Sequence, residues 1–168
     1  DEPCTLGGFR ANLRPVFAPS STPPTIVLAI SGSIAAYKAV EVARLLKKAG
    51  ANVVPILTRG AKEFIGAQTL SGITGEAVVE DMFDPGFAGE KHVDLGRRAD
   101  LILIVPTTAD LLARMAAGRA DDLVTALVLC ASCPIVAAPA MHPRMWSHPA
   151  TARNIKTIGD DGRITFVG

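Results

Sequence analysis

The sequence predicts an α/β fold, in which a single domain is built on a Rossmann-like or flavodoxin-like, doubly wound parallel sheet. Two observations lead to this expectation. Continuous runs of aliphatic and β-branched residues, which are typical of strands buried on both faces, recur along the chain. Segments with helical periodicity separate these runs, and strands that alternate with helices form βαβ units and a parallel sheet. A chain of 168 residues is long enough for one domain with a core.

The first half of the chain begins its regular structure at Thr25. Residues 25–30 read Thr-Ile-Val-Leu-Ala-Ile, which is an uninterrupted β-prone run. Residues 53–57 predict a second strand, and roughly residues 60–73 predict a helical region. Between the two strands, apolar residues recur at helical spacing until Gly50, which we expect to end that helix. The apolar positions are Ala36, Val40, Ala43 and Leu46.

The second half repeats the alternation. Leu101 to Val105 is the clearest buried strand, and a short helix over residues 93–99 is expected to lead into it. Leu123 to Met141 runs 19 residues without a charge, but two prolines interrupt it, so a buried helix and a buried strand fit better than a membrane span. Helices are also expected around residues 108–117, 121–130 and 149–158, and strands over residues 134–138 and 164–167.

Residues 1–24 differ in composition from the rest of the chain. They are rich in proline and serine without regular periodicity, so we expect an N-terminal arm, followed by the domain over residues 25–168. The arm lacks the apolar segment of a signal peptide. The three cysteines of the chain give no disulfide framework, so a reducing, cytoplasmic location is expected.

The charge balance excludes some partners. Lys and Arg number 17 and Asp and Glu number 16, which gives a net charge of +1 and no electrostatic reason to expect nucleic acid or an anionic membrane. Charged residues make up 20%, below the usual share of about 25%. So little charge on a small domain indicates that it buries surface against further copies of itself.

Ligands of parallel α/β sheets bind beyond the carboxyl ends of the strands, so the segments that follow the predicted strands are candidate sites. Ser31 to Ala35 joins the first strand to a helix N-terminus, where unpaired N–H groups and the helix dipole favour an anion. The alternative is that Ser33 only caps the helix. Thr107 or Thr108 can cap the next such helix, or its free amides can bind the edge of a heteroaromatic ring.

The same segments disfavour other ligands. The loop after the first strand lacks the three glycines of a dinucleotide fingerprint, and the second strand ends at Thr58 without an acidic residue to hold a ribose. The chain also lacks a P-loop motif. A single phosphate on a compact cofactor fits these features best.

Histidines and cysteines offer weaker signals. His92 opens a short predicted helix and His142 follows the fourth strand, and each can be a cap, a surface residue or a catalyst. Cys130 and Cys133 have C-x-x-C spacing but lie at the C-terminal end of a helix, so we expect small buried residues rather than a redox pair. The histidines and cysteines lack compact ligand spacing, so no metal is expected.

Several segments in one order resemble the homo-oligomeric flavin-containing cysteine decarboxylases, over roughly residues 25–168. That family includes phosphopantothenoylcysteine decarboxylase of coenzyme A synthesis and the peptidyl-cysteine decarboxylases of lantibiotic maturation. The matching segments are Ser31 to Lys38, His92, Ala99 to Leu101, Pro106 to Leu111, Ala116 to Leu123 and Pro139 to Trp146.

The resemblance implies FMN as the cofactor and a homotrimer or a dodecamer of trimers, with FMN at the subunit interface. His92 takes the position of the catalytic histidine. His142 takes a catalytic and substrate-binding position, together with Met145 and Trp146. The implied cofactor-binding residues are Ser31, Gly32, Ser33, Ile34, Ala35, Thr58, Thr108, Ala109, Asp110, Leu111, Ala140 and Met141.

The implied reaction is FMN-dependent decarboxylation of a C-terminal cysteine through a thioaldehyde and an enethiolate. The favoured substrate is 4′-phosphopantothenoylcysteine, in coenzyme A biosynthesis. One alternative is an oxidative peptidyl-cysteine decarboxylase that makes a C-terminal aminoenethiol in a lantibiotic-type peptide. Another is a non-catalytic, flavin-binding regulatory module.

Two departures from the family pattern bear on these expectations. His142 stands where the family has the asparagine that binds the substrate carboxylate, and Asp121 replaces another asparagine. In the coenzyme A enzymes a cysteine-bearing loop follows this region, whereas the sequence ends at Gly168. A chain truncated at Gly168 and an enzyme without the reductive half-reaction both remain open.

Overall fold

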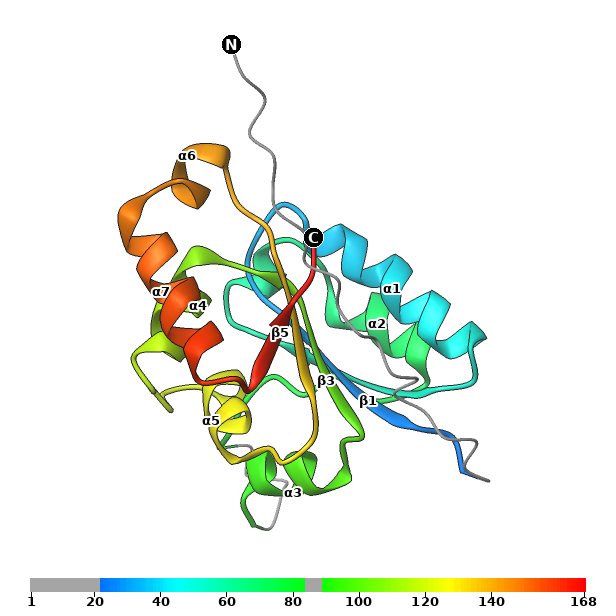
Figure 1. Cartoon of the computed structure of the whole chain (residues 1–168). Helices are drawn as coiled ribbons and strands as arrows, with labels where there is room; N and C mark the ends of the chain where they lie inside the picture. The colour runs from blue at the N-terminus through cyan, green and yellow to red at the C-terminus, as the bar shows by residue number, and fades with distance from the viewer. Residues whose placement is uncertain (1–21, 84–88) are drawn as a thin grey trace.

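Within the computed structural model, which describes residues 22–83 and 89–168, five strands pair into one parallel sheet (Figure 1). The expected arm lies outside the described residues except for its last three positions. The predicted strands are confirmed, with ends shifted by at most two residues. Their bounds are β1 (Thr25–Ile30), β2 (Asn52–Leu57), β3 (Leu101–Thr107), β4 (Ile135–Pro139) and β5 (Ile164–Phe166).

The strand order is β2-β1-β3-β4-β5, which is the flavodoxin-like order. In the sheet, β2 lies on one side of β1 and β3 lies on the other. The connections that leave β1 and β3 therefore run in opposite directions. Ligands of such sheets bind at this switch point, at the carboxyl ends of the strands. The β1 residues Ile26 to Ile30 are at most 2% exposed, as the aliphatic run predicted.

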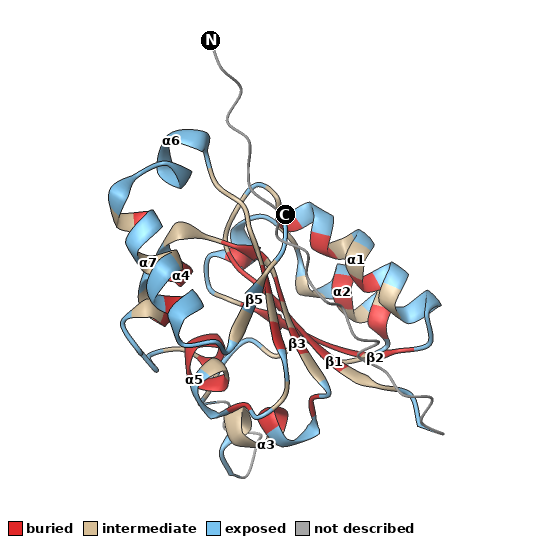
Figure 2. Ribbon diagram, viewed as in Figure 1, coloured by how far each residue is buried: buried red, intermediate tan, exposed pale blue. Residues whose placement is uncertain are grey.

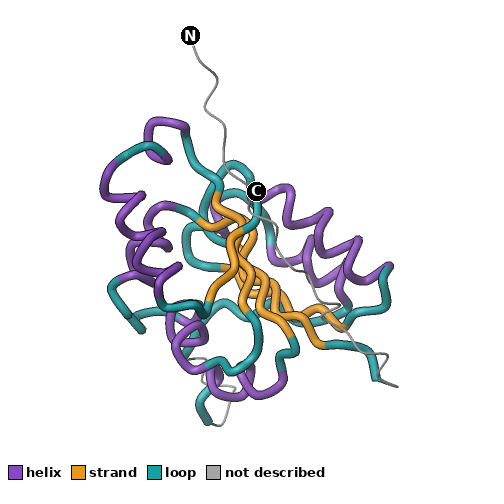
Figure 3. The backbone as a smooth tube through the Cα atoms, viewed as in Figure 1, coloured by secondary structure: helices purple, strands orange, loops and turns teal. Residues whose placement is uncertain are grey.

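Alternate side chains of β1 enter two separate cores, one on each face of the sheet. Ile26, Leu28 and Ile30 pack with α1 and α2, whereas Val27 and Ala29 belong to the core under α3, α4, α5 and α7. Figure 3 shows the strands between these two helical layers, and Figure 2 shows that the central strands are buried. The helices are α1 (Ala36–Lys48), α2 (Ala67–Thr74), α3 (Lys91–Arg98), α4 (Ala109–Ala116), α5 (Leu123–Cys130), α6 (Pro143–Trp146) and α7 (Pro149–Asp160).

Two local expectations need correction. The helical region predicted over residues 60–73 is interrupted, because η1 (Ala61–Glu63) ends before Gly66, which has extended backbone and precedes α2. The sequence also did not predict α6, a single turn that begins with Pro143 directly after its cap, His142. The apolar stretch from residue 123 folds as α5 followed by β4, and no helix of the described residues is long and apolar enough to cross a membrane.

Candidate functional site

A cavity of about 850 Å³ opens at the carboxyl ends of the first four strands. Each of the loops after β1, β2, β3 and β4 contributes to its lining, as the switch-point argument predicted. The lining residues are Ser31, Gly32, Ser33, Thr58, Arg59, Gly60, Glu63, Thr108, Ala109, Asp110, Arg114, Asp121, Asp122, Ala140, Met141, His142 and Met145.

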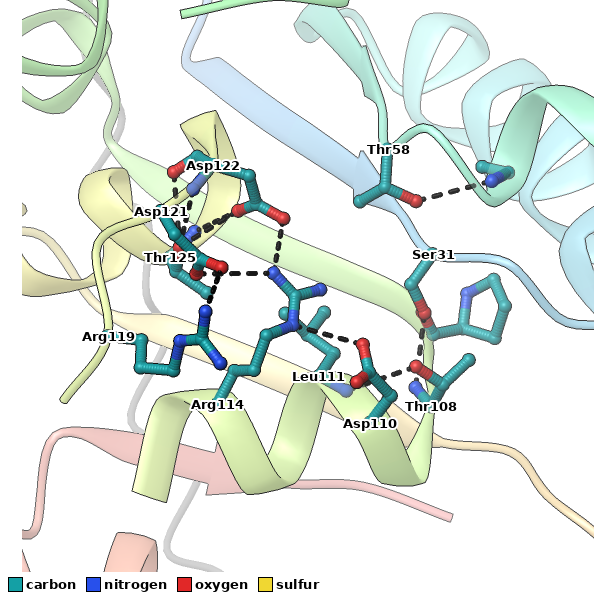
Figure 4. Close-up of polar contacts among 12 residues, drawn as sticks. Ser31, Thr58, Thr108, Asp110, Leu111, Arg114, Arg119, Asp121, Asp122 and Thr125 are labelled. Atoms are coloured by element: carbon teal, nitrogen blue, oxygen red, sulfur yellow. Dashed lines mark hydrogen bonds and ion pairs between the residues drawn. The ribbon is translucent and has the colours of Figure 1, made fainter. Parts of the chain in front are cut away.

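The loop after β1 offers backbone rather than hydroxyl donors. Ser31 is buried, and its Oγ donates to the carbonyl of Pro106 at 2.7 Å while accepting from the N–H of Thr108 at 3.1 Å. That hydroxyl therefore joins two loops (Figure 4). The N–H groups of Gly32, Ser33 and Ile34, by contrast, have no hydrogen-bond partner among the described residues. They precede α1 and form a site suited to an anion.

Ser33 does not cap α1, contrary to the alternative considered from the sequence. The helix begins after Ala35, which makes no side-chain cap bond. The Ser33 hydroxyl accepts the N–H of Ala35 at 3.3 Å. It also donates a long hydrogen bond, of 3.5 Å, to the carbonyl of Ala140. The loops after β1 and β4 therefore approach each other at this hydroxyl.

A neighbouring loop leaves no room for a side chain on Gly32. A Cβ atom at this position would lie 2.7 Å from the carbonyl carbon of Gly60 and 2.8 Å from its oxygen. Thr58 holds that second loop by accepting the N–H of Ala61 at 3.2 Å on its Oγ1. Close backbone contact between the two loops thus shapes the anion-binding end of the cavity.

The loop after β3 forms the second helix N-terminus at the cavity. Thr108 caps α4 by accepting the N–H of Leu111 at 3.2 Å, as one of the sequence alternatives expected. Among the described residues, the N–H groups of Ala109 and Asp110 have no partner, and both residues line the cavity. The Leu111 side chain is fully buried in the core and does not line it. The exposed amides are suited to acceptor atoms of a ring edge.

A charged cluster between α4 and α5 borders the same end of the cavity (Figure 4). Arg114 donates from Nε to Asp110 at 3.0 Å and from Nη1 to Asp122 at 2.5 Å. Asp121 lies 3.7 Å from the same Nη1 and also pairs with Arg119. The sequence did not single out Arg114 or Asp122, because only the packing of α4 against α5 brings them together.

The cluster shifts the pKa of its members. Burial alone raises the pKa of the Asp122 carboxyl, but hydrogen bonds from Thr125 and Arg114 outweigh burial and lower that pKa overall. For Arg114 burial acts in the opposite direction and lowers the pKa, but the Asp122 and Asp110 carboxylates outweigh burial and raise that pKa overall. The ion pair is therefore fully charged at neutral pH.

His142 follows β4 and lines the cavity. Its Nδ1 accepts the N–H of Arg144 at 3.2 Å and thereby caps α6. An accepting Nδ1 carries no proton, so a neutral His142 has its proton on Nε2 and can donate one hydrogen bond from that atom. Met145 also lines the cavity, whereas Trp146, 49% exposed, does not.

His92 is not brought to this cavity within one chain. It lies in the first turn of α3, where its carbonyl accepts from the Cys130 thiol at 3.3 Å, beyond the C-terminal end of α5. Asp122 lines the cavity at the other end of α5, and eight helical residues span about 12 Å. Figure 1 shows α3 and α6 at opposite ends of the sheet. The His92 Nδ1 atom is buried and has no hydrogen-bond partner within the described part of the chain.

The cysteines are more accessible than the sequence indicated. Cys130 is exposed and Cys133 is partly exposed, and both are free thiols, so the expectation of buried residues is wrong for Cys130. Burial of the sulfur and the charge of Glu90 raise the pKa of Cys130, and burial also raises that of Cys133. Thiols of this kind stay protonated at neutral pH.

Within residues 22–83 and 89–168, no cluster of three or more acidic, histidine or cysteine side chains is arranged to hold a metal ion.

Comparison with known proteins places the chain among flavoproteins. The Flavoprotein family model matches residues 18–168. The coenzyme A biosynthesis bifunctional protein CoaBC of Mycobacterium tuberculosis is 49% identical over 144 residues, which is 86% of this chain and 34% of that protein. CoaBC of Vibrio cholerae is 44% identical over 142 residues, which is 84% of this chain and 36% of that protein. The chain thus spans about a third of these relatives.

Solved structures show the same similarity. The FMN-dependent cysteine decarboxylase SpaF superposes with a TM-score of 0.79 at 37% identity, covering 85% of this chain and 83% of that one. A PPC decarboxylase mutant complexed with pantothenoylaminoethenethiol gives a TM-score of 0.78 at 28% identity, with 86% and 81% of the two chains covered.

Proposed function

We propose that this chain, which belongs to the flavoprotein family, is an FMN-dependent decarboxylase of C-terminal cysteine, and that its substrate is 4′-phosphopantothenoylcysteine. The identity to CoaBC proteins supports the substrate, and the likeness to SpaF and PPC decarboxylase supports the cofactor and the reaction. The observation that carries the proposal is the cavity lined by two helix N-termini with free N–H groups, because FMN combines a phosphate with a ring that carries hydrogen-bond acceptors.

The residues present fit FMN. The free N–H groups of Gly32, Ser33 and Ile34 would hold the phosphate at α1, where the absence of a Cβ at Gly32 also keeps the loop close. The amides of Ala109 and Asp110 would bind the ring edge. A volume of about 850 Å³ lies within the range of cofactor pockets. Bound FMN would supply the two-electron acceptor that makes loss of CO₂ from cysteine feasible.

His142 is the residue that we assign to the substrate carboxylate. With Nδ1 occupied by the cap of α6, its Nε2–H is the one donor that the neutral ring has left. A donor that the fold holds in one tautomer is oriented before the carboxylate binds. Met145 lines the same part of the cavity and would pack against the substrate.

His92 would act on the substrate from a neighbouring subunit. It cannot line the cavity of its own chain, because it lies at the opposite end of α5. Large apolar side chains are exposed on the rim of the site, namely Ile34 at 81% and Tyr37 at 63%. Such residues mark a surface that a partner covers. We therefore propose a homo-oligomer, a trimer or a dodecamer of trimers, in which one copy brings α3 to the cavity of the next.

The proposal is tested by mass spectrometry of the reaction under air with 4′-phosphopantothenoylcysteine and, separately, with a peptide that ends in cysteine. Loss of CO₂ from the small substrate is the expected result, and loss of CO₂ alone would mean that the two electrons taken by FMN return to the product. Loss of CO₂ and two hydrogens from the peptide would support the second candidate, a peptidyl-cysteine decarboxylase, which the 37% identity to SpaF favours. A flavin-loaded protein that changes neither substrate would refute catalysis and would favour the third candidate, a regulatory flavin-binding module.

A cytoplasmic location remains a prediction.

A further inference from the structure

We infer that Arg114 binds the flavin ring directly, with a guanidinium that two aspartates fix so that its remaining N–H groups face the cavity. The inference rests on the proposed function only in taking FMN as the ligand. The sequence alone did not mark this residue.

The position of the guanidinium supports the inference. The Arg114 side chain is 18% exposed and lines the cavity. Its Nε donates to Asp110 and its Nη1 to Asp122, whereas Nη2 has no hydrogen-bond partner among the described residues. Figure 4 shows this third nitrogen turned toward the part of the site bordered by Ser31. A guanidinium carries five N–H donors in a rigid fork, so the free ones point in a defined direction.

The partners of Arg114 are themselves held in place. The Oδ1 atom of Asp122 accepts the N–H of Thr125 at 2.9 Å as the N-cap of α5, and the Thr125 hydroxyl accepts the Asp122 N–H at 3.2 Å in return. That arrangement leaves Oδ2 for Arg114. Asp110 lies one turn before Arg114 on α4 and accepts from it. The guanidinium is thus oriented before any ligand binds, which lowers the entropy cost of binding.

The charge of the cluster indicates which ligand atom Arg114 receives. Three carboxylates and two guanidiniums, Arg114 and Arg119, meet here, so the cluster carries a net charge of −1. A second anion is therefore disfavoured beside the cluster, which leaves the phosphate to the free N–H groups that precede α1. Carbonyl oxygens of the flavin ring are neutral acceptors that become more negative when the ring is reduced. Donation from Arg114 would consequently hold the reduced form more tightly than the oxidised form.

The alternative is that Arg114 only ties α4 to α5. A purely structural residue would change stability but not the midpoint potential of the bound flavin. The decisive measurements on the holoprotein are therefore the midpoint potential, by equilibration with redox dyes, and the loss of FMN on dilution, by flavin fluorescence. Circular dichroism checks that each variant is folded.

Three variants make the test. Arg114→Gln should lower the midpoint potential and weaken FMN binding by about 10-fold or more, as expected for a lost hydrogen bond to a charged donor. Arg114→Lys keeps the charge without the fork, so it should retain most of the potential but bind FMN more weakly than the wild type. Arg119→Gln removes the same charge from the same cluster at a residue outside the cavity lining, and should leave both quantities near the wild-type values.

Two outcomes would overturn the inference. One is a folded Arg114→Gln protein with wild-type potential and FMN affinity, and the other is an Arg119→Gln protein that changes both as much. If Arg114→Gln does not fold, the lysine variant decides, since wild-type FMN binding in that variant would exclude a role for the fork. A wild-type protein that binds no FMN would instead refute the proposed function.

Discussion

Adding one methyl group at Gly32 should disrupt the site far more than adding one at Gly60, although the two glycines face each other. A Cβ on Gly32 would lie 2.7 Å from the Gly60 carbonyl carbon, deep inside van der Waals contact. The obstacle is backbone, which cannot swing aside as a side chain can, so the loops after β1 and β2 must separate. Overpacking of this kind costs about 1–3 kcal/mol of folding free energy. The separation would also displace the N–H groups proposed to hold the FMN phosphate.

The control is Gly60→Ala. A Cβ on that residue would lie 3.4 Å from the nearest atom, the Gly32 Cα, and its φ of −69° is open to any residue. Urea unfolding should therefore show a loss of about 1–3 kcal/mol for Gly32→Ala and a change of less than about 1 kcal/mol for Gly60→Ala. The ratio of flavin to protein absorbance should fall in the first variant alone. Equal flavin content and equal stability in the two variants would refute this reasoning.

Three further predictions concern other parts of the site. His92→Asn should purify with FMN and with an unchanged oligomeric state but without decarboxylase activity; retained turnover would remove His92 from catalysis. Because the folded pKa of Asp122 is lowered, its contribution to stability is complete above the ordinary carboxyl pKa and is lost as the pH falls through the folded value. Asp122→Asn, which can still cap α5, should therefore lose roughly 0.5–1 kcal/mol at neutral pH and show a shallower loss of stability below about pH 4, and an unchanged acid transition would contradict the ion pair. The exposed Cys130 thiol has a raised pKa, so its alkylation by iodoacetamide should be slower at pH 7.5 than that of a free cysteine peptide; mass spectrometry that shows equal rates would contradict this prediction.

The strands were predictable because each is a short aliphatic run, and burial on both faces of a parallel sheet requires such runs. The edge of the sheet that carries the site followed from the topology of alternating strands and helices. Thr108 was correctly named as a possible cap, since a hydroxyl residue between a strand and a helix has few other roles. These features depend on neighbouring residues of the sequence, which is why local patterns were sufficient.

The remaining features depend on contacts between distant segments. Ser31 was expected to contact the cofactor, and its hydroxyl instead bonds to Pro106 at the end of β3 and to Thr108 just after it, about 75 residues later. The cluster around Arg114 arises only when α4 packs beside the cap of α5. His92 lies near Cys130, away from the cavity of its own chain. None of these arrangements has a local sequence signature.

The most direct test of the proposed cofactor site is to compare, by calorimetry, the affinity of the flavin-free protein for FMN and for riboflavin. The two ligands differ only in the phosphate, which is proposed to bind the free N–H groups of Gly32, Ser33 and Ile34. Charge-assisted hydrogen bonds are worth roughly 1.5–3 kcal/mol each, so FMN should bind at least about 100-fold more tightly. Equal affinities would show that the loop after β1 does not bind the cofactor phosphate and would contradict the proposed site.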